Sequence, residues 1–174
     1  TPHTGKDARE IICSSGEFVS FLKELAPTLL EGSDAQRVPQ SVLSATAQTR
    51  RAFLKAYVEG EGHVTPSERE ITVASTSEDL LEDVRAMLLT LGIGAQLHPR
   101  KNGSYRLRIS GENFGKYVRT IGFVTERKSA VAESHAGTNA NTNTDLVPVG
   151  DSLHDLREEV GLTQAECGLP RSTY

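Results

Sequence analysis

The stretch that decides the fold runs from Phe53 to Gly62 and reads FLKAYVEGEG. Its apolar residues fall at helical spacing, so we predict a helix that begins near Ala47 and runs through this stretch. Small residues recur every four positions and therefore share one face of the helix; they are Ala52, Ala56 and Gly60. Because small side chains let another backbone approach closely, we predict that this face is a helix-packing seam.

The same helix places an acidic residue, Glu61, at its C-terminal end. We expect Gly62 to adopt a left-handed conformation there and to stop the helix. A carboxylate at that end faces the negative pole of the helix dipole, which costs stability and asks for a functional reason. The alternative interpretation is a core helix with a frayed acidic end.

The residues that follow predict further strands and helices. An extended piece is expected at 63–65 and a half-buried strand at 70–75, followed by a helix that Ser77 caps and Gly92 closes. Strands at 96–100 and 105–110 flank a turn and form a hairpin, and a third helix covers 112–121. The predicted order is therefore α-β-β-α-β-β-α.

Residues 54–62 resemble the LAGLIDADG motif of homing endonucleases and intein-embedded endonucleases. The positions that match or conservatively replace the motif are Leu54, Ala56, Val58, Glu59, Gly60, Glu61 and Gly62. Lys55 and Tyr57 depart from it. The order of elements is also that of one LAGLIDADG repeat. The resemblance implies an α+β fold, with one αββαββα half, a four-stranded antiparallel DNA-binding sheet and a C-terminal helical fragment.

A second similarity lies within the chain and joins residues 11–25 to residues 107–121. It pairs Phe18 with Phe114 and Cys13 with Ile109, so we predict that Cys13 is buried. We interpret residues 1–44 as the end of a first repeat whose own motif helix is missing, and 45–135 as a second, complete repeat. Residues 136–147 are predicted to be a polar linker. Residues 148–174 resemble part of a helix-turn-helix, with an acidic helical hairpin as the alternative.

The predicted hairpin carries the second chemical signal. Alternation along its strands places polar and basic side chains on one face. The candidate DNA-binding residues are Gln96, His98, Arg100, Lys101, Arg106 and Arg108, and no acid interrupts them in sequence. Arg and Gln can read guanine and adenine edges, and a two-stranded ribbon fits the major groove. A solvated sheet face is the alternative. The net charge of −4 argues mildly against nucleic acid, but the acids gather elsewhere in the chain.

The resemblance also implies the chemistry. Glu61 matches the metal-binding acidic position, Glu59 an earlier structural one, and Mg²⁺ (or Mn²⁺) is the implied cofactor. The implied partners are double-stranded DNA and a second motif helix, from the missing first repeat or from a second copy of the chain. Arg37 and Lys128 are further catalytic candidates. An arginine cannot act by losing a proton, and a surface lysine is the alternative for Lys128.

The sequence therefore predicts a metal-dependent enzyme, a site-specific homing endonuclease domain of an intein that cuts double-stranded DNA. We expect this fragment to be inactive alone and to lack the splicing elements. Arg37-Val38-Pro39 and residues 147–151 favour the intein setting. The alternatives are a non-catalytic transcription regulator with a degenerate LAGLIDADG domain and helix-turn-helix, or an inactive remnant. Because no membrane helix or signal peptide is recognisable, a cytoplasmic location is expected.

Overall fold

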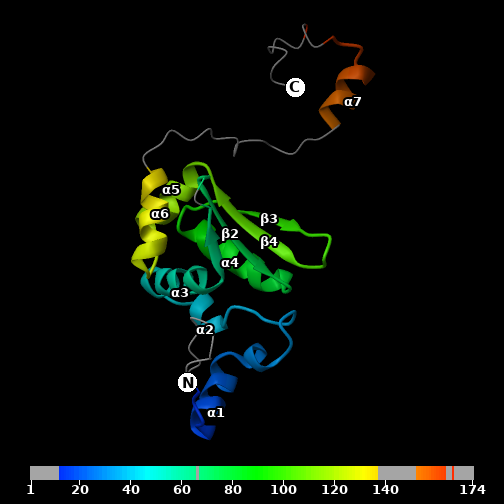
Figure 1. Ribbon diagram of the computed structural model, residues 1–174. Helices are drawn as coiled ribbons and strands as arrows, with labels where there is room; N and C mark the ends of the chain where they lie inside the picture. The colour runs from blue at the N-terminus through cyan, green and yellow to red at the C-terminus, as the bar shows by residue number, and fades with distance from the viewer. Residues whose placement is uncertain (1–11, 66, 137–151, 164–165, 167–174) are drawn as a thin grey trace. The chain divides into compact units, whose positions relative to one another are not determined.

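The computed structural model describes residues 12–65, 67–136, 152–163 and 166. The chain divides into two units, Thr1–Asn141 and Thr142–Tyr174, which are described separately. The helices of the first unit are α1 (Gly16–Leu25), the 3-10 helix η1 (Pro27–Leu30), α2 (Gln40–Leu43), α3 (Ala47–Glu61), α4 (Glu78–Thr90), α5 (Glu112–Thr120) and α6 (Glu126–Ala136). Its strands are β1 (Gly62–Val64), β2 (Glu70–Ser75), β3 (Gln96–Pro99) and β4 (Tyr105–Ser110) (Figure 1).

The four strands form one antiparallel sheet in the order β1-β2-β4-β3, which confirms the predicted sheet. Ile71 lies opposite Ile109 and Val73 opposite Leu107, and all four side chains are buried. Alternation sends their neighbours to the other face. The sheet therefore has one apolar face and one face that is open for polar side chains.

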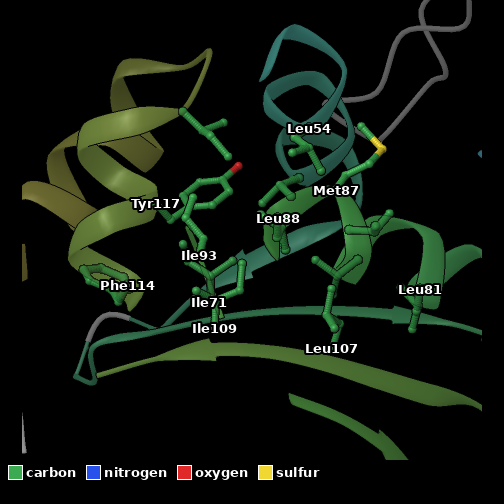
Figure 2. Close-up of a cluster of buried hydrophobic side chains, with 14 of the residues drawn as sticks. Leu54, Ile71, Leu81, Met87, Leu88, Ile93, Leu107, Ile109, Phe114 and Tyr117 are labelled. Atoms are coloured by element: carbon green, nitrogen blue, oxygen red, sulfur yellow. The ribbon is translucent and has the colours of Figure 1, made fainter. Parts of the chain in front are cut away.

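The hydrophobic core lies between that apolar face and the helices. Figure 2 shows Ile71, Leu107 and Ile109 pointing from the sheet toward the helical layer that carries Leu54 and Leu88. Both leucines are fully buried. Burial of a leucine side chain contributes about 1.5–3 kcal/mol, so α3 and α4 are fixed to the sheet chiefly by this packing.

The helix boundaries follow from local chemistry. Ser77 Oγ accepts from the Leu80 N–H at 3.1 Å, which confirms the predicted cap of α4. The Thr46 hydroxyl caps α3 in the same way, through the Thr49 N–H. Gly92 follows α4 with φ +75, a left-handed conformation that a glycine adopts without strain.

The expectation for Gly62 is wrong. Its φ of −88 and ψ of 145 are extended, so α3 passes directly into β1 without a left-handed residue. Glycine is needed there for space, because a Cβ on Gly62 would collide with the backbone carbonyl oxygen of Val58. Helix α6 was not predicted at all, since residues 126–136 carry no strong apolar stripe.

Near the start of the chain, Ser15 caps helix α1 through the Phe18 N–H at 3.2 Å. Its side chains differ from those of the similar helix α5, because Phe18 is 45% exposed and Phe114 is fully buried. Cys13 is exposed, so the prediction that it is buried is wrong. No strand forms at residues 12–15, and the apolar sheet environment of Ile109 is therefore not reproduced around Cys13.

In the second unit, α7 (Ser152–Glu159) ends before Gly161, whose φ is +73. Glu166 Oε2 accepts from the N–H and hydroxyl of Thr163 at 2.8 and 2.6 Å. Most of the linker and of the helix-turn-helix-like segment lies outside the described residues. No helix within the described ranges is both long and apolar enough to cross a membrane.

Candidate functional site

The site begins with Glu61, the last residue of α3, which is exposed. It lines a hollow of about 480 Å³ together with Tyr57 and residues of β2, among them Ser75. Burial, followed by the charge of Glu61, raises the pKa of Tyr57 to about 12. Near neutral pH the phenol of Tyr57 in this hollow is therefore neutral. Sequence reasoning missed Tyr57, although its spacing of four residues from Glu61 places both on one helix face.

The predicted seam is open. Ala52, Ala56 and Gly60 are all exposed along α3. A Cβ built on Gly60 would meet no atom within 4 Å in the described structure. Nothing in the described part of the chain therefore explains why this face carries only small residues.

Lys128 lies on α6 and is buried, with 8% of its surface exposed. Its Nζ donates to three backbone oxygens at the end of α3: Val58 O at 3.2 Å, Glu59 O at 2.5 Å and Gly62 O at 2.6 Å. The surface-lysine interpretation is wrong, because this ammonium group caps the C-terminal end of the helix that carries Glu61. A catalytic role for Lys128 stays a prediction.

Glu59 makes the complementary contact from α3 to the segment that opens α6. Its carboxylate accepts from the N–H of Val124 at 2.9 Å, and from the N–H and hydroxyl of Thr125 at 3.3 and 2.7 Å. Burial tends to raise the pKa of Glu59, but the hydrogen bonds and the charge of Lys128 together lower it. Glu59 and Lys128 thus form a reciprocal cap, in which Lys128 binds backbone oxygens at the end of α3 and Glu59 binds backbone N–H groups just before α6.

Arg37 lies just before α2, and its guanidinium is bound by two carboxylates of α4. Nε and Nη2 donate to Asp83 at 3.1 and 2.9 Å, and Nη1 donates to Asp79 at 3.3 Å. The Asp83 hydrogen bond and the two negative charges raise the pKa of Arg37. These contacts fasten the segment before α2 to α4, and a catalytic role for Arg37 stays a prediction.

The predicted DNA-binding residues gather on the hairpin and its turn. Gln96 lies opposite Arg108, and His98 lies opposite Arg106, so these four side chains share the polar face. Arg100 and Lys101 lie at the turn and are exposed. His98, Arg100, Arg106 and Arg108 also line a hollow of about 660 Å³ on this face.

The same face contains an acid that the hairpin sequence alone does not show. Glu70 of β2 is buried, and its carboxylate binds the guanidinium of Arg108. Glu68 lines the same hollow. Alternation predicts the face of Glu70, but its contact with Arg108 depends on the pairing of β2 with β4, which the sequence did not reveal.

The predicted metal site depends on which donor groups the chain places near Glu61. No group of three or more His, Cys, Asp or Glu side chains in the described ranges is arranged to hold an ion. Glu61 offers one exposed carboxylate. Mg²⁺ commonly takes one or two carboxylates, with phosphate oxygens and water as its other ligands. Glu61 therefore fits a metal shared with a second acid and a nucleic acid, rather than one that this chain encloses.

Two curated relatives of the chain are proteins of Thermococcus kodakarensis. The chain is 30% identical over 131 residues to the probable translation initiation factor IF-2 of Thermococcus kodakarensis, covering 75% of the chain and 11% of that protein. It is also 30% identical over 125 residues to the DNA polymerase II large subunit of the same organism, covering 59% of the chain and 7% of that protein. The chain thus spans about a tenth or less of the length of these curated relatives.

The fold has a counterpart among solved structures. The crystal structure of I-DmoI in complex with DNA and Ca aligns with a TM-score of 0.50 and 22% identity, over 70% of this chain and 59% of that one. This likeness concerns the fold, and it agrees with the α+β architecture and antiparallel sheet. Residues 48–122, which hold α3, the sheet and α5, match the family model of the LAGLIDADG-like domain. This part of the chain is a LAGLIDADG-like domain.

Proposed function

We propose that this chain supplies one half of a metal-dependent endonuclease that cuts double-stranded DNA at a specific site. The observation that carries the proposal is the exposed Glu61 at the end of α3, beside the open face of Ala52, Ala56 and Gly60. A second helix of the same kind can approach that face closely and bring its own acid next to Glu61. A divalent metal bound between such acids and phosphate would activate water and neutralise charge on the leaving oxygen.

The polar sheet face supports DNA as the substrate. Arg106 is exposed and lies opposite His98, and the exposed turn adds Lys101. Arginine can contact guanine edges and phosphates, whereas a lysine adds charge that attracts the DNA backbone. In this proposal the sheet positions the duplex and Glu61 contributes to the metal.

An inserted setting, such as an intein, accounts for the pattern of relatives. The chain matches a short part of a translation initiation factor and a short part of a DNA polymerase subunit. These two proteins have unrelated tasks, so a shared segment of 7–11% of their length is better explained by a mobile insertion than by a common activity. We propose no splicing residues in this chain.

The test uses the full-length parent protein and a site selected from a randomised duplex library. Glu61→Gln keeps the size of the side chain and removes its charge. Cleavage in Mg²⁺ is expected to fall by about a hundredfold or more, because a charge-stabilising group is lost. DNA affinity is expected to stay within about threefold, since Glu61 is not a phosphate-binding cation.

Glu112→Gln is the matched control. Within the described residues, Glu112 pairs with Lys116 of the same helix at 2.6 Å. This variant is expected to cut like the parent. If Glu61→Gln cuts as well as the parent, the assignment of Glu61 is wrong, and a DNA-binding regulator becomes the better interpretation.

A further inference from the structure

The ammonium group of Lys128 has no donor left for a substrate. An ammonium carries three N–H donors. Three backbone oxygens of Val58, Glu59 and Gly62 lie 2.5–3.2 Å from Nζ, and the residue is 8% exposed. A lysine that protonates a leaving group or contacts a phosphate needs at least one accessible N–H. In this structure all three point at the backbone of α3 and the first residue of β1.

The positions of those oxygens explain what the contact does. The last carbonyls of a helix lack partners within the helix and carry its negative pole. Glu61 lies between two of the bound residues, Glu59 and Gly62. One cation therefore holds the backbone on both sides of Glu61 and opposes the dipole that would otherwise repel its carboxylate.

The contact is reinforced from the other direction by Glu59. Its carboxylate binds the N–H groups of Val124 and Thr125 and the Thr125 hydroxyl, at 2.7–3.3 Å. The distance from Lys128 to the end of α3 is thus fixed by two sets of hydrogen bonds that run in opposite senses. Loosening of the reciprocal cap at Lys128 would free the last turn of α3 while leaving the core contacts of Leu54 intact.

We propose that Lys128 is a positioning residue, which holds the backbone of Glu61 so that its carboxylate is presented in one orientation to a divalent cation. This inference rests on the proposed function, since it takes Glu61 to be the metal ligand. It assigns no proton transfer to Lys128.

The test compares three forms of the chain by NMR spectroscopy. Lys128→Met keeps an unbranched side chain and removes the charge and all donors. Arg127→Met makes a similar change at the neighbouring exposed position of the same helix. The first readout is amide hydrogen exchange at residues 60–63 and, for comparison, in α4. The second is the broadening of amide signals near Glu61 by Mn²⁺ alone.

In Lys128→Met, exchange at 60–63 is expected to become about tenfold faster while α4 stays protected, because only a local unit opens. At a fixed Mn²⁺ concentration, broadening near Glu61 is expected to fall about threefold or more, since the ligand is no longer held in place. Arg127→Met is expected to change neither readout. A purely structural lysine would instead raise exchange in α4 and at 60–63 alike.

Unchanged protection at 60–63 and unchanged Mn²⁺ broadening in Lys128→Met would overturn the proposal. If Lys128→Met does not fold, Lys128→Gln keeps two N–H donors and takes its place, judged by the same two readouts. Glu61→Gln separates the two ideas. If Mn²⁺ broadens the parent and Glu61→Gln equally, the assigned metal ligand is wrong and the proposed function fails with it. The exchange readout then still shows whether Lys128 holds the last turn of α3.

Discussion

At the scale of single residues, the two glycines that flank Glu61 are required for different reasons. A Cβ on Gly62 would collide with the carbonyl oxygen of Val58 and lie 2.6 Å from Val58 Cγ1. Apart from its own helix backbone, a Cβ on Gly60 would meet no atom of the described residues within 4 Å. The need for glycine at position 62 is explained by the chain itself, whereas the need at position 60 is not.

Alanine substitutions at these two positions are expected to have opposite effects. Gly62→Ala forces the end of α3 apart and is expected to lower the free energy of unfolding by about 1–3 kcal/mol. Gly60→Ala lies within α3 without a clash and is expected to raise it by about 0.5–1 kcal/mol, because alanine loses less entropy in a helix. Urea unfolding followed by circular dichroism measures both. A Gly62→Ala chain as stable as the parent would contradict the steric argument.

Glu59 is expected to make stability depend on pH. Its pKa is lowered in the folded chain from its ordinary value of 4.5, so its stabilising contribution is present above that value and is lost as the pH falls through the folded pKa. The groups that face it are Lys128, Val124 and Thr125. Burial, followed by the charge of Glu59, raises the pKa of Tyr117 on α5. Glu59→Gln is expected to unfold about 1 kcal/mol more easily at pH 7, as other lost helix caps do.

The measurement is the free energy of unfolding of both chains between about pH 7 and pH 3. Since other carboxylates titrate in both chains, the informative quantity is the difference between the two curves. That difference is expected to shrink as the pH falls. Parallel curves would show that the carboxylate of Glu59 is not held as described.

At the scale of elements, the sequence predicted those whose polar and apolar residues follow a regular pattern. Strands β2 and β4 begin and end at the predicted residues, because alternation along a sheet with one buried face is a strong signal. Helix α6 was missed, because its buried residues Lys128 and Ala132 do not form an apolar stripe. Lys128 is buried by carbonyl groups of α3, and a contact over 66–70 positions leaves no local trace in the sequence.

The hairpin as an element leads to a prediction about DNA binding. Arg108 is bound to Glu70, but Arg106 is exposed and is therefore the cleaner residue to change. Arg106→Ala is expected to weaken binding to duplex DNA and to reduce the slope of log affinity against log salt by about 1, since one fewer counterion is released. Arg108→Ala is expected to destabilise the fold as well, because it leaves a buried carboxylate without its cation.

Fluorescence anisotropy at several salt concentrations gives both the affinity and the slope. Arg85→Ala on α4 is the control, since Arg85 pairs with Glu82 of the same helix at 2.9 Å. It is expected to leave binding unchanged. An Arg106→Ala chain with the parental slope would remove this face from the proposed DNA interface.

At the scale of the whole molecule, we expect the rest of a first repeat to pack on two exposed faces, one on α1 and one on α3. Phe21 on α1 is 56% exposed, while the matching Tyr117 on α5 is fully buried against the core. The small-residue face of α3 is open along Ala52, Ala56 and Gly60. The four-residue spacing predicted the second face, whereas the exposure of Phe21 was not predicted. The sequence did not indicate the reciprocal cap beside the second face, which depends on how α3 and α6 meet.

The open seam leads to the last prediction. Ala56 is exposed, so Ala56→Leu is expected to change the stability of the isolated chain by no more than about 0.5 kcal/mol. Where a second LAGLIDADG-like helix packs on the seam, the larger side chain would hold the two backbones apart at a cost of about 1–3 kcal/mol. Association of two copies is then expected to weaken about tenfold or more. Sedimentation over a range of concentrations measures this association, and Ala130→Leu, the same change at an exposed position of α6, is the control.

If the parent chain stays monomeric at every concentration, the same pair of variants is compared for cleavage by the full-length protein. Cleavage by Ala56→Leu at the level of Ala130→Leu would show that no helix packs on this face.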